Sequence, residues 1–210
     1  MKKSWLSVGA VIVVALLVAA WQAGAFKTQP PPPANAAPAG AQLAGLVVKP
    51  RNGMGGYSRE KFPHWAKVSG ECDTRETVLK RDGQDVRTDA QCRPTAGTWH
   101  SPYDGATWTK ASDVDIDHTV PLGQAWESGA ASWTTDHRKE FANDLVRPQL
   151  KAVTDNVNQA KGDKAPDEWR PALKADWCAY ATDWITVKSY YQLTVTDPEK
   201  AALTDMLNYC

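Results

Sequence analysis

The stretch SDVDIDHTVPLGQAW, residues 112–126, concentrates charge where an extended segment comes to an end. Its centre, VDIDH, alternates apolar and acidic residues, which predicts a short β-strand. Asp117 and His118 close this strand, and Pro121 follows soon after, where a sheet ladder cannot continue. Neighbouring residues of a regular strand point to opposite faces. We therefore expect the backbone to leave strand geometry at Asp117–His118, so that both side chains serve one site.

A carboxylate beside an imidazole suits a hydrolytic centre. Asp117 can hold a hard cation, and His118 can take a proton from water. A short helix predicted over 153–163 carries Asn158 and Lys161, which share a face because they are three residues apart. Asn158 offers a neutral oxygen to a metal, and Lys161 offers a cation to a phosphate. Asp115 lies on the same strand face as Asp117, where it either bonds a neighbouring site residue or is solvated.

The rest of the chain predicts a mixed α+β order with short strands and without βαβ alternation. Asp73 and Glu76 form a capping-box pattern, and Asp197 is expected to cap the last helix. The expected helices cover 72–82, two short stretches within 123–144, 153–163, 173–193 and the stretch after 197, and a hairpin is expected over 96–110.

The first 42 residues are predicted to stand apart from the folded domain. Residues 1–25 combine Lys2, Lys3 and an apolar run with Ala23-Gly24-Ala25, which is typical of a cleaved secretory signal. The apolar run is long, so an uncleaved membrane anchor remains the alternative. Residues 26–42 are rich in Pro and Ala and predict a disordered linker. One domain is expected over 43–210, outside the cytoplasm in either case.

Cysteine and charge content narrow the class of protein. The chain has 4 cysteines and no C-x-x-C spacing, so disulfides are expected in an exported chain. Of the three possible connectivities, sequence order favours Cys72–Cys92 with Cys178–Cys210. Basic and acidic side chains are balanced at 24 each, so any site for an anion must be local.

At this point the motifs resemble a known family. DIDHTVPL followed by NQAKGD is similar to the HNH, or ββα-metal, nuclease motif. CDTRETVLKRD, FAND and EWRP lie in the matching order, and the whole set resembles exported HNH endonucleases of actinobacterial type, related to the HNH domain of modification-dependent restriction endonucleases. The resemblance covers nearly the whole domain. It implies an α+β fold with a ββα-metal core, a short β-hairpin, surrounding helices and two disulfides.

The resemblance also implies residue roles. His118 resembles the general base, and Asp117 and Asn158 resemble the ligands of one divalent metal ion. The expected ion is Mg²⁺, with Mn²⁺ as the alternative. Both ligands are expected at the surface. Gln149 takes the position where many HNH proteins have an Asn that supports the His-bearing loop. It can make the same amide bonds but is one methylene longer.

The implied function is a secreted, metal-dependent endonuclease that hydrolyses phosphodiester bonds of DNA, with RNA as a further substrate. Lys161 and Arg75 are expected to contact substrate phosphates, and sequence specificity is expected to be low because such contacts are mostly to the backbone. No stable protein partner is evident, and an uncleaved N-terminal segment would tether the domain to the membrane. Two alternatives remain: a non-catalytic envelope or surface module on a nuclease fold, and a nuclease toxin effector.

Overall fold

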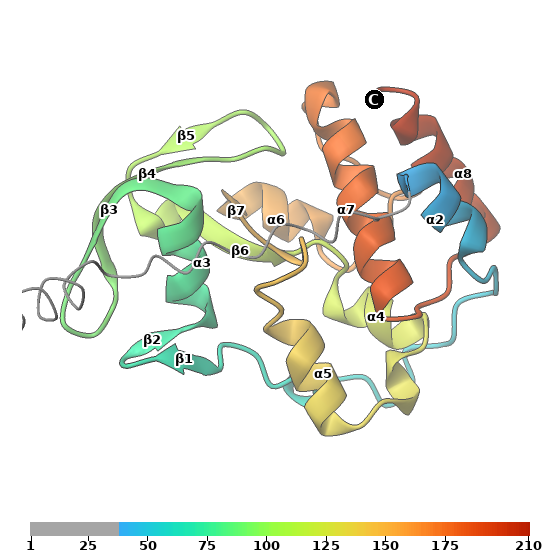
Figure 1. Cartoon of the computed structure of the whole chain (residues 1–210), viewed down its shortest axis with the longest axis horizontal. Helices are drawn as coiled ribbons and strands as arrows, with labels where there is room; N and C mark the ends of the chain where they lie inside the picture. The colour runs from blue at the N-terminus through green and yellow to red at the C-terminus, as the bar shows by residue number, and fades with distance from the viewer. Residues whose placement is uncertain (1–37) are drawn as a thin grey trace, which may run out of the picture. The chain divides into compact units, whose positions relative to one another are not determined.

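The computed structural model describes residues 38–210 (Figure 1). The expected signal segment and residues 26–37 of the expected linker lie outside this part of the chain. The linker ends earlier than predicted, because helix α2 spans Ala39–Gly45. Leu43 of this helix is buried in the main core, which explains why the segment is ordered. Within residues 38–210, no helix has both the length and the apolar character needed to cross a membrane.

The domain is mixed α+β, as predicted. The helices after α2 are α3 (Thr74–Asp82), α4 (Leu122–Glu127), α5 (Thr135–Ala142), α6 (Asp155–Lys161), α7 (Trp177–Tyr190) and α8 (Asp197–Leu207), with 3-10 turns η1 (Arg59–Lys61), η2 (Ala111–Asp113), η3 (Ala130–Ser132) and η4 (Lys174–Asp176). The strands are β1 (Lys67–Ser69), β2 (Cys72–Asp73), β3 (Gly83–Thr88), β4 (Pro94–His100), β5 (Thr107–Trp108), β6 (Val114–His118) and β7 (Leu150–Thr154). They form separate sheets β1-β2, β3-β4-β5 and β6-β7.

The central unit is the antiparallel pair β6-β7 followed directly by α6. Its register runs from Val114 opposite Thr154 to His118 opposite Leu150. Strand β7 was not predicted, and the helix expected from residue 153 begins only at Asp155. The five residues of β7 acquire strand geometry by pairing with β6, a long-range contact that local propensity does not report. Figure 1 shows this β6-β7-α6 unit between α3 and α7.

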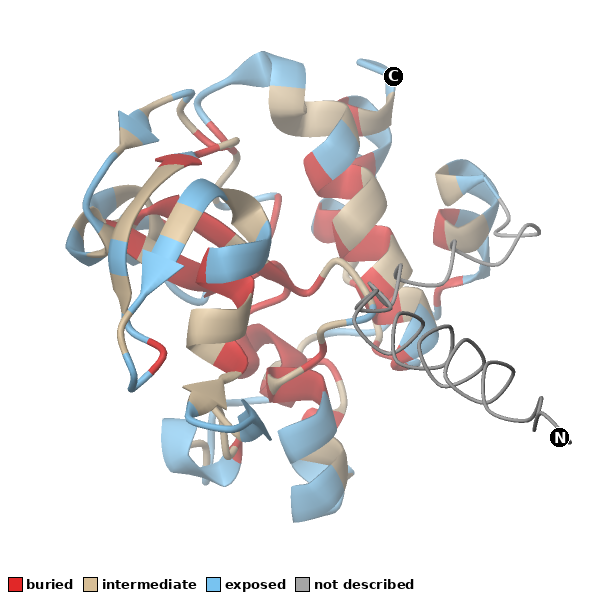
Figure 2. Ribbon diagram, turned by 60° about the vertical axis from the view of Figure 1, so that its left-hand side comes forward, coloured by how far each residue is buried: buried red, intermediate tan, exposed pale blue. Residues whose placement is uncertain are grey.

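The two faces of the β6-β7 pair belong to two hydrophobic clusters. Val114 and Ile116 pack with Leu150 and Ala152 in a cluster that includes residues of α3 and β4. Val153 points to the other face and joins the larger cluster, which contains residues of α2, α4, α5, α7 and α8. This is the alternation expected of a strand pair buried on both sides. Figure 2 shows buried residues through the middle of the domain and exposed residues on its outer faces.

Helix ends follow local capping chemistry. The predicted capping box of α3 is confirmed, since Asp73 and Glu76 bond each other's backbone N–H groups. The prediction for α8 was wrong by one residue. Its N-cap is Thr196, not Asp197, because Thr196 can form a capping box with Glu199 three residues on.

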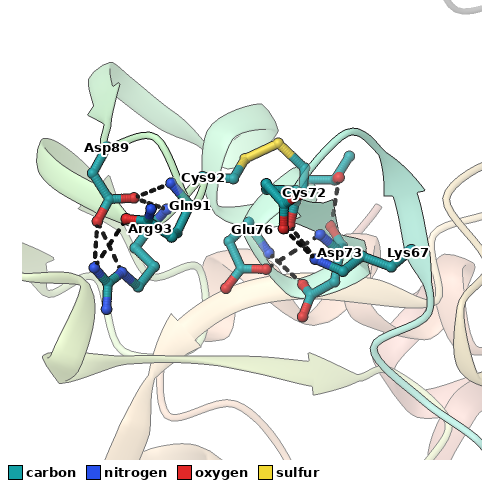
Figure 3. The surroundings of a disulfide bond; sticks show 10 residues. Lys67, Cys72, Asp73, Glu76, Asp89, Gln91, Cys92 and Arg93 are labelled. Atoms are coloured by element: carbon teal, nitrogen blue, oxygen red, sulfur yellow. Dashed lines mark hydrogen bonds and ion pairs between the residues drawn. A yellow bond between two sulfur atoms is a disulfide. The ribbon is translucent and has the colours of Figure 1, made fainter.

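Both predicted disulfides are confirmed. Cys72 bonds Cys92, which joins the start of α3 to the loop between β3 and β4 (Figure 3). Cys178 bonds Cys210, which joins the first turn of α7 to the C-terminus. The first bond therefore fastens the loop after β3 beside α3, and the second fastens the end of the chain to α7.

We expect each disulfide to contribute about 3–4 kcal/mol to the free energy of unfolding, because the loops that they close span 20 and 32 residues. Cys72→Ala with Cys92→Ala, and separately Cys178→Ala with Cys210→Ala, should lower the urea midpoint accordingly. Wild-type protein unfolded in a thiol reductant is the control and should lose more than either double variant. A loss below about 1 kcal/mol in a double variant would contradict this prediction.

Candidate functional site

A cleft lies at the end of β6 and brings together three segments that are distant in the sequence. Its volume is about 220 Å³. It is lined by Arg59 from η1, by Ile116, Asp117 and His118 from β6, by Pro121 and Leu122 at the start of α4, and by Asn158, Gln159, Gly162 and Asp163 from α6 and the residues after it. A larger and more open hollow of about 520 Å³, between Asp136 and Arg147, contains none of the predicted site residues. The smaller cleft is therefore the candidate functional site, because it contains the predicted site residues.

His118 is fixed by a backbone contact. Its Nε2 lies 3.0 Å from the carbonyl oxygen of Ala142. A carbonyl can only accept, so Nε2 carries the proton and Nδ1 keeps its lone pair. Within residues 38–210 no side chain or backbone group bonds Nδ1. The expected break before His118 is absent, because the ladder still pairs His118 with Leu150. The strand ends just after this pair, and the cleft at its end is lined by residues of both faces.

The imidazole of His118 is neutral at physiological pH. Burial lowers the pKa of His118 to about 3, and the hydrogen bond to the Ala142 carbonyl opposes this shift. The nearby cations Arg59 and Lys161, together with His64, lower the pKa further. The ring also packs beside Trp65, with ring centroids 5.7 Å apart. A neutral, oriented imidazole with a free nitrogen can accept a proton from water.

Gln149 supports the backbone that follows His118, in the manner expected from its position. Its side-chain oxygen accepts from the Val120 N–H at 3.1 Å, and its side-chain nitrogen donates to the Val120 carbonyl at 2.9 Å. Its own carbonyl accepts from the Thr119 N–H. The longer side chain is accommodated because Gln149 is fully buried beside the turn. These bonds hold the turn between β6 and Pro121 in one conformation.

Asp117 is a core residue, not the surface ligand that was expected. Only 4% of its surface is exposed. Tyr103 donates its hydroxyl to Oδ2 at 2.6 Å, and Lys161 donates from Nζ to Oδ1 at 2.8 Å. Each carboxylate oxygen therefore has one protein partner and retains one further lone pair. The two donors fix the orientation of the carboxylate at the cleft.

Lys161 does not lie where a phosphate contact requires it. Its side chain is fully buried, and Nζ bonds both Asp117 and the His118 carbonyl, the latter at 2.9 Å. Burial lowers the pKa of Lys161, and the Asp117 carboxylate opposes that shift. Lys161 is buried because its side chain is long enough to reach from the last turn of α6 across to β6. The ammonium group therefore ends inside the domain and not at the surface.

Asn158 is held beside the strand by Asp115. Its Nδ2 donates to Asp115 Oδ2 at 3.2 Å, which settles the open question of whether Asp115 is merely solvated. The amide oxygen of Asn158 has no protein partner within the described residues and remains available at the cleft. Within residues 38–210, no group of three or more His, Cys, Asp or Glu side chains is arranged so that it could hold a metal ion. Any cation here would depend on Asp117, Asn158, water and substrate.

Arg75 was expected to contact phosphate, but it is not part of the cleft. Its Nη2 lies 3.4 Å from the carbonyls of Ala111 and Val114, so it fastens α3 to the start of β6. Two residues of the site were missed in the sequence: Tyr103, which bonds Asp117, and Arg59, which lines the cleft. Tyr103 sits in the turn SPYDG, which signalled only a hairpin, and Arg59 lies more than fifty residues before Asp117 in the sequence. Only folding brings them to Asp117.

The buried position of Lys161 has a direct consequence for stability. Lys161→Met should lower the free energy of unfolding by about 3–5 kcal/mol, because it leaves the Asp117 carboxylate buried without its counter-ion. Tyr103→Phe should cost about 1.5–3 kcal/mol, the range for a hydrogen bond to a charged group. The control is Lys164→Met, whose exposed side chain bonds only the Ala160 carbonyl. Urea unfolding measures all three, and equal stability of the Lys161 and Lys164 variants would refute the buried pair.

Comparison with known proteins assigns the chain to a family. Residues 74–206 match the model of the C-terminal domain of GmrSD restriction endonucleases, a match that includes β6, β7 and α6. An uncharacterized secreted protein of Arthroderma benhamiae is 62% identical over 181 residues, which cover 86% of this chain and 89% of that protein. That relative is fungal, so it does not support the narrower expectation of an actinobacterial type. No solved structure matches the chain. The chain belongs to the family of the GmrSD restriction endonuclease C-terminal domain.

Proposed function

We propose that this protein is an exported, metal-dependent endonuclease of the HNH type, which hydrolyses phosphodiester bonds of DNA and, as a second substrate class, RNA. The observation that carries the proposal is His118, held through Nε2 and without a partner at Nδ1 in residues 38–210, at a cleft that Asp117 and Asn158 also line. The restriction endonucleases that give the family its description support a nuclease activity. Low sequence specificity is expected, because backbone contacts carry no sequence information.

The donor atoms at the cleft fit a divalent cation that prefers oxygen. Asp117 keeps a lone pair on each carboxylate oxygen, and Asn158 keeps its amide oxygen. Mg²⁺ is commonly held by one or two carboxylates, with water and phosphate oxygens completing the shell, and Mn²⁺ accepts the same ligands. When bound, such an ion would neutralise the negative charge that develops on the phosphate and on the leaving oxygen.

The residues of this chain divide the remaining work. His118 Nδ1 accepts the proton of a water molecule as the oxygen of that water attacks phosphorus and the bond from phosphorus to the leaving oxygen breaks. The Ala142 carbonyl orients the imidazole and fixes its tautomer, and Gln149 holds the turn after His118. Lys161 and Tyr103 hold the Asp117 carboxylate in place. The side chains of His118, Asp117 and Gln149 are thus held in position before substrate arrives, which is what makes such a site effective.

Export is supported by three separate features. Residues 1–25 have the pattern of a secretory signal. The relative of Arthroderma benhamiae is described as secreted. The two disulfides are typical of an oxidising compartment.

The first test concerns the general base. His118→Ala should reduce single-turnover cleavage of plasmid DNA in Mg²⁺ by ~10²–10⁴-fold, the usual cost of losing a general base. DNA binding should persist, because the phosphate contacts are left in place. His100→Ala is the matched control, since His100 is exposed and its ring bonds only Thr107. Cleavage at the wild-type rate by His118→Ala would remove His118 from the mechanism.

The second test concerns the metal. Asn158→Ala should raise the Mn²⁺ concentration needed for half-maximal cleavage and weaken Mn²⁺ binding in calorimetry, because it removes an oxygen donor. Asn156→Ala is the control, since Asn156 is exposed on the same helix and does not line the cleft. Chelation by EDTA should abolish cleavage by every variant. Identical Mn²⁺ affinities for the Asn158 and Asn156 variants would exclude Asn158 as a ligand.

A further inference from the structure

The cleft needs a cation to hold a phosphate, and the lysine expected to supply it is committed elsewhere. Lys161 is buried in its pair with Asp117. Among the residues that line the cleft, Arg59 is the one with a permanently cationic side chain. The other acidic residue there, Asp163, accepts from the Gly123 N–H at the start of α4 and does not pair with Arg59. Among the protein side chains that line this cleft, the permanent positive charge therefore comes from Arg59 of η1.

Arg59 differs from most arginines of the domain in having no partner within residues 38–210. It is exposed, and its guanidinium makes no hydrogen bond or ion pair with a described residue. Arg87 on β3 shares this state but lies outside the cleft. The other arginines each bond a carboxylate or a carbonyl: Arg51, Arg75, Arg81, Arg93, Arg138, Arg147 and Arg170. A guanidinium free at a cleft is available for an external anion.

The backbone that carries Arg59 is firmly anchored. Phe62 is fully buried and packs edge-on against Trp126, with ring centroids 6.4 Å apart. Tyr57 packs against the same indole at 5.9 Å. Arg138 donates from Nε to the Lys61 carbonyl at 2.9 Å. The turn thus holds its place, and only the Arg59 side chain has to order when an anion binds, which limits the entropic cost of binding.

We propose that Arg59 binds a phosphate of the nucleic acid strand in the cleft, the role expected from the sequence for Lys161. This inference rests on the proposed nuclease function. A guanidinium presents two parallel N–H donors that match two phosphate oxygens, a geometry that a lysine cannot offer. The cleft of about 220 Å³ lies below the ~300–1,000 Å³ of pockets that enclose whole small ligands. It fits one backbone linkage of a polymer that continues beyond it on both sides.

The test uses the full chain as wild type, Arg59→Gln, Arg59→Lys and Arg87→Gln. The probe is a fluorescein-labelled DNA duplex, titrated in EDTA so that no cleavage occurs, over a series of salt concentrations. Arg59→Gln should bind about tenfold or more weakly, and its slope of log affinity against log salt should be shallower by about one. Arg59→Lys should restore the slope but not the full affinity, and Arg87→Gln should behave as wild type.

Two results would overturn the proposal. One is an Arg59→Gln variant with wild-type affinity and salt slope. The other is an Arg59→Lys variant that restores none of the slope, because a charge contact would survive that change. The same titration with an RNA strand of matching sequence tells whether the contact is shared by both substrates. Cleavage in Mg²⁺ is measured in parallel. If the wild-type protein binds DNA through Arg59 but never cleaves it, the nuclease function is contradicted and the Arg59 contact stands. If Arg59→Gln binds and cleaves DNA normally, the Arg59 contact is contradicted and the nuclease function stands.

Discussion

The buried ammonium of Lys161 is the constraint on which the site depends. A charged group that is buried away from water needs an opposite charge or hydrogen-bond acceptors close to it. For the Lys161 ammonium these are the Asp117 carboxylate and the His118 carbonyl. These two partners are neighbours on β6, whereas Lys161 ends α6. Any movement of the helix away from the strand would therefore separate a buried charge from its counter-ion, which costs several kcal/mol. Lys161 thus ties α6 to β6, together with the bond from Asn158 to Asp115.

The arrangement of apolar residues explains why the site lies where it does. The β6-β7 pair is covered on both faces, by the cluster around α3 on one side and by the larger cluster on the other. Its side faces are thus closed to solvent, and the end of β6 is where polar groups remain accessible. The turn after His118 and the last turn of α6 meet at this end. A cleft with buried walls and fixed donors is the consequence.

The aromatic residues serve packing more than recognition. Trp184 is fully buried in α7 and donates from its indole to Glu199. Trp126 is covered by Tyr57 and Phe62, so it supports the turn that carries Arg59. Base stacking is therefore not needed to explain these side chains. Affinity for a nucleic acid would come from the charge and the metal at the cleft, in keeping with the balanced charge of the chain.

Local structure could be predicted from the sequence where residues that are neighbours in the sequence are also neighbours in space. The capping box of α3, strand β6 and the hairpin of β4 and β5 follow from short-range patterns, and cysteine order sufficed for the disulfides. The short motifs around His118 and Asn158 likewise carried the family resemblance that the match to residues 74–206 supports at the level of the GmrSD domain.

The sequence by itself thus indicated the α+β class, favoured the observed cysteine pairing and located the β6 and α6 segments of the site. Only the tertiary structure decided which side chains face solvent there. Lys161 and Arg59 are both cations on short helical elements, and nothing local distinguishes them. The packing of α6 against β6 buries the first, and the packing of Phe62 beneath η1 presents the second at the cleft. Burial is a property of the surroundings, so charge can be read from a sequence while its accessibility cannot.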